Sequence, residues 1–123
     1  MASHLKVSGF SGTAATYKIV HNTDSDETAD TDVTGTSGRI YQIYILNGAG
    51  TYKVYTKFKL TSGVVTPGTT EPDMMLVAGT STSETYEFPG GLAFDQLSFW
   101  TTRLPATSDQ TAPNATTVTI LCT

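Results

Sequence analysis

The chain has 123 residues, of which 38% are hydrophobic, with a net charge of −4 and a pI of about 4.8. This length suits one domain with a modest core. The acidic balance, and the lack of any apolar run as long as a membrane span, argue against nucleic acid and membrane as partners. Thr makes up roughly a fifth of the chain, and with 11 Gly and 5 Pro this predicts an all-β domain with many turns.

The first 13 residues are small and polar apart from Leu5, Val7 and Phe10. Leu5 and Val7 alternate with polar neighbours, so residues 1–13 form either a short strand or an arm that packs on a neighbour. The opening Met-Ala-Ser-His lacks a basic region followed by an apolar run, so we expect no signal peptide and synthesis in a cytoplasm. Residues 16–21 (TYKIVH) predict the first strand of a single domain over residues 14–123.

Carboxylates are concentrated in residues 22–32 (NTDSDETADTD) at Asp24, Asp26, Glu27, Asp30 and Asp32. Such a cluster suits a hard cation such as Ca²⁺. However, no Gly stands at the tight-turn position and no Glu closes the loop. We therefore expect a solvated surface loop without a metal. A catalytic carboxylate pair would need a pocket that shifts the pKa values, and the sequence indicates none.

Residues 39–60 are the centre of the predicted fold. Two runs of branched and aromatic residues flank Asn47-Gly48, a dipeptide typical of tight hairpins. The second run alternates, which predicts a core face with Tyr52, Val54, Thr56, Phe58 and Leu60. The opposite face is predicted to be basic and wet, with Lys53, Tyr55, Lys57 and Lys59.

The first run of this hairpin is apolar on both faces. Strict alternation places Tyr41, Ile43 and Ile45 on one face, and Ile40, Tyr44 and Leu46 on the other. This is typical of a central strand that is covered on both sides. We expect a second sheet on one side and a partner subunit on the other.

The rest of the chain alternates turns and short strands. Pro67-Gly68 and Pro89-Gly90-Gly91 mark turns, the second of them before Leu92, and strands are predicted over residues 74–77, 84–88, 97–102 and 115–122. The single cysteine, Cys122, is expected to be a small buried residue of the closing strand. Trp100 is either part of the inter-sheet core or an exposed stacking platform. About eight strands in one domain predict a two-sheet β-sandwich of jelly-roll type.

Catalytic motifs are missing from the sequence. It contains no phosphate-binding Gly-rich loop ending in Lys-Ser or Lys-Thr, no Gly-x-Ser-x-Gly and no His-Glu-x-x-His. Cys122 with a histidine is a poor candidate for a nucleophile pair, because its place in the chain does not hold it rigidly. We therefore expect no enzymatic activity and no cofactor.

Several short turn and strand motifs follow one another along the chain. These are G-x-I-Y at residues 38–41, I-L-N at 45–47, Y-x-V-Y at 52–55, T-P-G-T-T-E-P-D at 66–73 and Y-E-F-P-G-G-L-A-F at 86–94, followed by W-T-T at 100–102. Their order resembles a family of small virion structural proteins of tailed bacteriophages, and the likeness covers about residues 16–123. The acidic residues 22–32 and the charge of the lysine-rich strand depart from this pattern.

The resemblance implies a capsid decoration or cement protein, which binds the outer surface of the head and stabilises it. It implies a homotrimer, the major capsid protein as partner, and a virion location after synthesis in the host bacterial cytoplasm. The alternative is a tail, fibre or neck component with a lectin-like role, in which Tyr55 and Trp100 would stack on a host glycan. Residues expected at the coat or subunit interface are Leu5, Val7, Phe10, Tyr41, Tyr44, Lys53, Tyr55, Lys57 and Lys59.

Overall fold

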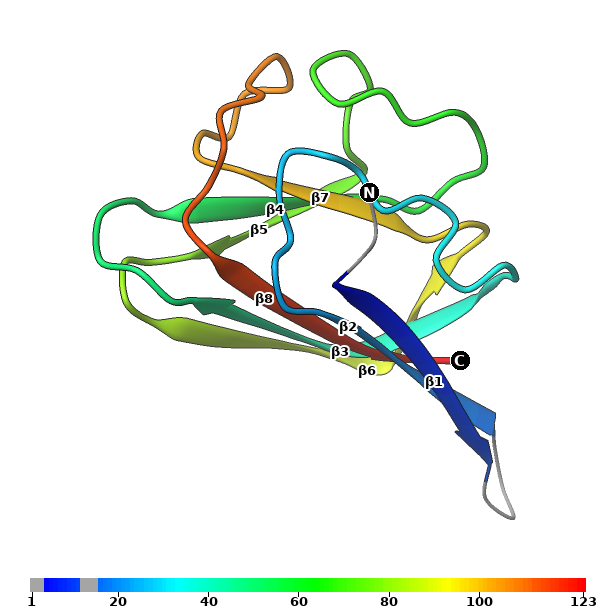
Figure 1. Cartoon of the computed structure of the whole chain (residues 1–123). Coiled ribbons are helices and arrows are strands. Elements are labelled where there is room, and N and C mark those ends of the chain that lie inside the picture. Colours follow the sequence, from blue (N-terminus) through cyan, green and yellow to red (C-terminus); the bar gives the residue numbers. More distant parts are fainter. Residues whose placement is uncertain (1–3, 12–15) are drawn as a thin grey trace.

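The computed structural model describes residues 4–11 and 16–123, which form eight strands and no helix (Figure 1). The strands are β1 (Leu5–Ser11), β2 (Thr16–Asn22), β3 (Gly38–Asn47), β4 (Val54–Lys59), β5 (Met74–Ala78), β6 (Ser83–Phe94), β7 (Ser98–Thr102) and β8 (Thr116–Cys122). They form two antiparallel sheets, in the orders β1-β2-β8-β3-β6 and β5-β4-β7. The predicted all-β sandwich of about eight strands is confirmed, and its jelly-roll type stays a prediction.

The core lies between the two sheets. Alternate residues of the central strands of the larger sheet point inward, and the pairs Ile43–Ile120 and Ile45–Val118 are fully buried. From the smaller sheet, Phe58 and Phe99 face them with ring centroids 6.0 Å apart. Branched side chains suit this position because they fill a pleated surface with little loss of rotamer freedom.

The predicted hairpin over residues 39–60 is wrong, because β3 and β4 belong to different sheets. Residues 48–53 instead cross from one sheet to the other. Asn47 makes this crossing possible: it is fully buried, and its Nδ2 donates to the carbonyl oxygens of Tyr52 (2.6 Å) and Gly79 (3.0 Å). Gly48 is not among the glycines with positive φ, so Asn47-Gly48 does not form the tight turn that this dipeptide favours.

A β-bulge in β3 overturns the predicted faces of that strand. The pairing with both neighbours shifts between Ile40 and Gln42. Ile40 therefore joins Ile43 and Ile45 in the core, while Tyr41 leaves the core face and meets the Tyr17 ring edge-on, with centroids 6.0 Å apart. The extra residue at the bulge reverses the alternation of side chains along the rest of the strand. A prediction based on a strict period of two does not include this reversal.

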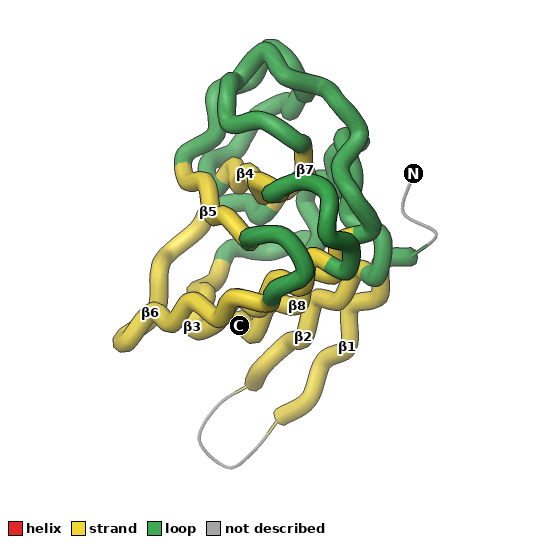
Figure 2. The backbone as a smooth tube through the Cα atoms, turned by 90° about the vertical axis from the view of Figure 1, so that its left-hand side faces the viewer, coloured by secondary structure: helices red, strands yellow, loops and turns green. Residues whose placement is uncertain are grey.

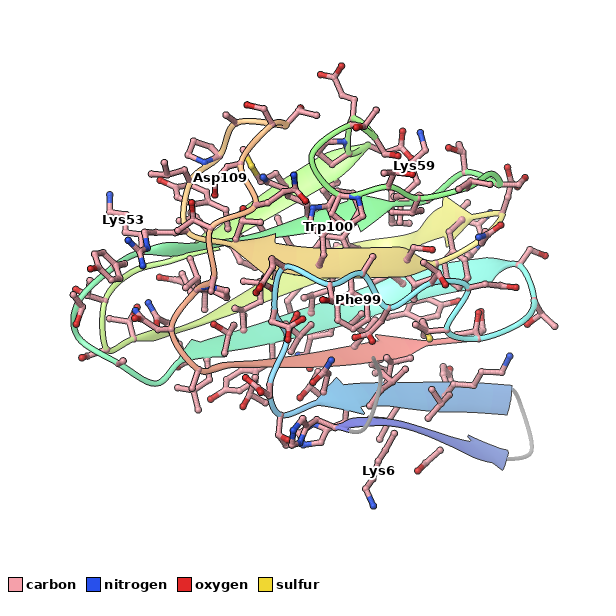
Figure 3. All side chains as sticks on the ribbon, turned by 45° about the horizontal axis from the view of Figure 1, so that its top comes forward. Lys6, Lys53, Lys59, Phe99, Trp100 and Asp109 are labelled. Carbon is pink, nitrogen blue, oxygen red and sulfur yellow. The ribbon has the colours of Figure 1, made fainter. Side chains whose placement is uncertain are left out.

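Loops form a third layer on the smaller sheet. Residues 61–73 and 103–115 lie over the side of this sheet that faces away from the larger sheet (Figure 1). Phe99 points to the core, and Trp100 points the opposite way, toward this layer (Figure 3). Trp100 is fully buried yet lies outside the inter-sheet core cluster. Both sequence-based interpretations of Trp100 are therefore wrong, because loops distant in sequence cover it.

The acidic segment over residues 22–32 is bound along β7 rather than lying free in solvent. Asp30 and Phe99 exchange two backbone hydrogen bonds of 2.9 Å each, and Thr101 N–H donates to the Asp26 carbonyl oxygen at 2.8 Å. Ser25 and Asp30 are buried, so the predicted solvated loop is wrong for these two residues. Burial raises the pKa of the Asp30 carboxyl, and the hydrogen bond from Asn22 Nδ2 (2.5 Å) opposes that rise.

Candidate functional site

The side of the larger sheet that faces away from the core is not covered by other segments of the described chain, residues 4–11 and 16–123 (Figure 2). We call it the outer face. Its side chains include Lys6, Ser8, Tyr17, Ile19, His21, Arg39, Tyr41, Gln42, Tyr44, Leu46, Ser83, Thr85, Glu87, Thr117, Thr119 and Leu121.

The strand register arranges these side chains in rows across the sheet. One row runs from Ile19 through Leu121 and Gln42 to Glu87. The next row contains His21 and Thr119, whose Nδ1 and Oγ1 atoms are 2.8 Å apart and joined by a hydrogen bond. The middle of the outer face therefore contains no Asp, Glu, Lys or Arg side chain, and it lies on the hydrogen-bonded strands β2, β8, β3 and β6.

Apolar side chains remain accessible on the outer face. Ile19 and Leu46 are each 37% exposed, and Tyr41, Tyr44 and Leu121 are half-buried. Formal charges occur at its margins, with Lys6 on edge strand β1, Glu87 on edge strand β6, and Arg39 at the start of β3, where its guanidinium donates to the Gly91 carbonyl oxygen. An uncharged, partly apolar centre with polar margins is typical of surfaces that bind other proteins.

The residues predicted at an interface do not form one surface. Tyr41 and Tyr44, which alternation predicts on opposite faces of the strand, both lie on the outer face, and their role at an interface stays a prediction. Leu5 and Val7 are on β1 but point to the other side of the sheet, where Val7 pairs with Val20. The side chain of Phe10 lies outside the described part of the structure.

The other predicted interface residues lie on the smaller sheet and the loop before it. Lys53 is exposed, whereas Tyr55 and Lys59 are half-buried, and Lys59 Nζ lies 3.4 Å from Asp73 Oδ1. Lys57 is fully buried, and its Nζ donates to the Ala106 carbonyl oxygen at 2.7 Å. The predicted basic, wet face is therefore wrong at Lys57, because residues 103–115 cover it.

Burial lowers the pKa of the Lys57 ammonium, and the nearby Asp109 carboxylate opposes this effect. Lys57 pairs with Trp100 across β4 and β7, so its alkyl chain lies beside the indole on the same side of the sheet. Its position and partners are those of a structural lysine that attaches a loop to the sheet. The sequence pattern contains no signal for this role, since a lysine on an alternating strand normally faces water.

Asp73 is a second anchor that sequence reasoning missed. Its carboxylate accepts hydrogen bonds from Leu60 N–H (2.7 Å) and Thr61 Oγ1 (3.2 Å), besides the Lys59 contact. Burial acts to raise the pKa of Asp73, but these hydrogen bonds and the charge of Lys59 outweigh it and hold the pKa below its ordinary value. The side chain thus joins both ends of the loop over residues 61–73.

A pocket of about 420 Å³ opens between the acidic segment and the loop layer. It is lined by Glu27, Thr28, Ala29, Thr31, Val65, Thr66, Pro67 and Gln110. No aromatic ring is among these residues, and Trp100 is buried elsewhere, so the expected stacking of a glycan on Trp100 is wrong. Within the described ranges, no group of three or more His, Cys, Asp or Glu side chains is placed to hold a metal ion.

Comparisons with protein-family models, with curated proteins and with solved structures find no match to this chain. In the part of the chain that the structure describes, no helix is long and apolar enough to cross a membrane. The outer face is therefore the best candidate for a functional surface on geometric grounds alone.

Proposed function

We propose that this chain is a non-enzymatic structural protein of a bacteriophage virion, which binds the outer surface of the head and stabilises it as a homotrimer. The observation that carries the proposal is the uncovered outer face, with its uncharged centre and accessible Ile19 and Leu46. The resemblance of residues 16–123 to small virion proteins supports the same role. In this proposal the partner is the major capsid protein, and the outer face is where it binds.

The two sheets differ in a way that favours this choice of surface. The corresponding side of the smaller sheet is already occupied by residues 61–73 and 103–115, which bury Lys57 and Trp100. A protein ligand can therefore reach sheet side chains over a wide area only on the larger sheet. Binding of a partly apolar patch removes hydrocarbon from water without desolvating buried charges.

Stabilisation of the head then follows from mass action. A protein that binds the assembled shell, and not its dissociated subunits, shifts the equilibrium toward the shell by an amount that grows with its free concentration. A trimer that contacts several coat subunits at once adds avidity, because its second and third contacts form at high effective concentration. Because the centre of the outer face is uncharged, we expect this binding to depend only weakly on salt.

The decisive test is immunogold electron microscopy of virions produced by cells that make this chain. Label over the whole head is the expected result. Label confined to the tail, or no label on virions while the protein is present in the infected cells, would contradict a decoration role.

A matched pair of variants tests the surface itself. Leu46→Asp places a charge on the outer face, whereas Val64→Asp places the same charge on a loop residue that is 88% exposed. We expect Leu46→Asp to abolish binding to purified heads and Val64→Asp to leave it unchanged. Equal binding of both variants would exclude the outer face as the contact surface.

A further inference from the structure

Strand β1 is an edge strand without the usual protection against pairing. It forms seven consecutive pairs with β2, with no shift in register, and no other strand of residues 4–11 and 16–123 pairs with its other side. Its sequence LKVSGFS contains one charge, at Lys6, and no proline. Edge strands that must stay unpaired normally carry several charges, a proline or a bulge, because their free N–H and C=O groups attract another strand.

Other strand edges of this molecule have features that limit pairing, since edge strand β5 is only five residues long and the free sides of β7 and β6 are blocked or irregular. The acidic segment pairs with the free side of β7 through Asp30. Strand β6 contains Pro89, two glycines at positive φ (Gly90 and Gly91) and the irregular pairing opposite the β3 bulge. Only its first half, residues 83–88, presents a regular edge, and this half contains Glu84 and Glu87.

The β1–β2 hairpin also extends beyond the smaller sheet (Figures 1 and 2). Val7 and Val20 form a pair on the core side of the hairpin, yet Val20 is fully buried while Val7 is 42% exposed. An aliphatic side chain on the core side of an edge strand thus remains uncovered by its own chain. The free edge and the exposed Val7 together leave room for one more strand.

The two edges of the larger sheet are complementary in charge and direction. Lys6 on β1 and Glu87 on β6 both lie on the outer face, both are exposed, and neither has an ion-pair partner among the residues that the structure describes. Since all neighbours in the sheet are antiparallel, β1 and β6 run in the same direction. A second copy in the same orientation can therefore place its β1 beside β6 as a parallel strand.

We propose that copies of this chain associate head to tail, with β1 of one copy paired to residues 83–88 of β6 in the next. Lys6 then lies beside Glu87 on the outer face, and Val7 lies on the opposite side beside the half-buried Tyr86 and Phe88. Each copy uses two different edges, so the contact is heterologous and either closes into a ring or continues as a filament. This proposal concerns contacts between copies and does not depend on the capsid role.

Charge reversal at the two edges tests the proposal. Sedimentation velocity of the purified full chain over a wide concentration series measures association, and the expected wild-type species is larger than the 13.1 kDa monomer. Lys6→Glu and Glu87→Lys each replace an attraction with a repulsion, and we expect association weaker by about tenfold for each. Lys53→Glu, at an exposed residue away from both edges, is the matched control and should not change association.

Mixing the two single variants distinguishes a head-to-tail contact from other arrangements. In each single variant the side chains at positions 6 and 87 have the same sign of charge, so copies of one variant repel each other at this contact. Between the two variants these side chains have opposite signs, so an equimolar mixture should regain association. The double variant Lys6→Glu/Glu87→Lys should regain it as well. Pairing of β1 with β1 would instead leave association unchanged in Glu87→Lys and give the double variant the same association as Lys6→Glu, because Glu87 lies on β6, outside that contact.

Three results would overturn the proposal: a wild-type chain that stays monomeric at every concentration, single variants that associate like the wild type, or a mixture that does not associate. Thermal unfolding of each variant verifies that the substitutions at these exposed positions leave the fold intact. The measurement contains no capsid, so a monomeric wild-type chain would contradict the proposed homotrimer but not the proposed binding to the head. Absence of label on virion heads would likewise leave this association proposal unaffected.

Discussion

The ammonium group of Lys57 lies 2.7 Å from the carbonyl oxygen of Ala106, which joins the centre of the smaller sheet to the loop over residues 103–115. Lys57 is fully buried and pairs with Trp100 across the sheet. This one hydrogen bond therefore links a β-strand, the single tryptophan and a loop that begins more than 40 residues later in the sequence. The sequence pattern predicts a surface position for Lys57, but in the fold this side chain is buried and holds a loop to the sheet.

Replacement of this anchor should destabilise the domain. Lys57→Met keeps most of the side-chain volume but leaves the Ala106 carbonyl oxygen without its donor, so we expect a loss of about 1–3 kcal/mol in the free energy of unfolding. Urea unfolding followed by Trp100 fluorescence measures it. Lys53→Met, at an exposed position, is the control and should change stability by no more than about 0.5 kcal/mol. Equal stability of both variants would contradict the anchor role.

Asn47 should be among the least replaceable polar residues. Its Nδ2 donates to Tyr52 and Gly79 at the point where the chain changes sheets, and the residue is fully buried. Asn47→Ala leaves two carbonyl oxygens short of a donor, and we expect a loss of about 2–4 kcal/mol in the free energy of unfolding, measured in urea. Asn114→Ala is a useful comparison, because Asn114 Nδ2 also donates to Tyr52 (2.9 Å) but the residue is only half-buried. A larger effect at Asn114 would be incompatible with this account.

Gly68 has a positive φ angle, which favours glycine, and the Gln110 side chain occupies the space that a Cβ atom would take. Its φ is +88°, and a Cβ atom there would lie 2.6 Å from Gln110 Cδ. We expect Gly68→Ala to lower the free energy of unfolding by about 1–3 kcal/mol, mainly through backbone strain and to a smaller extent because the exposed Gln110 side chain must move. Gly35→Ala, at φ +70° in open space, should show the backbone part alone.

The Gln110 side chain separates the two contributions at Gly68. Gln110→Ala removes the clashing atoms, so the penalty of Gly68→Ala should fall to that of Gly35→Ala in this background. An unchanged penalty would show that the two loops do not pack as described. Thermal or urea unfolding of the wild type, of Gly68→Ala, of Gln110→Ala and of their double variant completes the cycle.

Asp73 should contribute to the acid sensitivity of the domain. Its pKa is lower in the folded chain than the ordinary 3.8, so its stabilising effect is fully present above that value and is lost as pH falls through the folded pKa. We expect Asp73→Asn to lower stability at neutral pH by about 0.5–1 kcal/mol, since the carboxylate is partly exposed. Below the folded pKa the difference between Asp73→Asn and the wild type should shrink.

Unfolding free energies measured at neutral and at acid pH check this prediction. Asp95→Asn, at an exposed carboxylate, serves as the control for the general effect of removing a negative charge. A difference between Asp73→Asn and the wild type that stays constant with pH would contradict a role for the ionised carboxylate.

Local patterns predicted the strands but not their partners. The branched and aromatic runs at residues 40–46 and 54–58 became strands because alternation is a local property of the sequence. The assignment of these two strands to one hairpin failed because Asn47-Gly48 favours a tight turn locally, whereas the buried amide of Asn47 stabilises a crossing between sheets. Partner choice depends on contacts with β6, β7 and β8, which lie far along the chain.

The candidate site was predicted only in part for a similar reason. Tyr41 and Tyr44 reach the outer face, but alternation alone placed them on opposite faces, because the bulge between Ile40 and Gln42 gives no signal in a single sequence. Lys57 was expected in solvent because nothing near it in the sequence shows that residues 103–115 fold over it. Composition and periodicity do not show which side chains are covered by loops that are distant in the sequence.

The position of β8 in the larger sheet also sets the order of folding during synthesis. This strand is made after the other seven, yet it lies in the middle of the sheet and pairs with both β2 and β3. Until residues 116–122 leave the ribosome, β2 and β3 have no common neighbour and their core side chains Val20, Ile43 and Ile45 stay open to solvent. The nascent chain must therefore remain without its larger sheet for most of its synthesis, and formation of that sheet is a late, long-range and comparatively slow step.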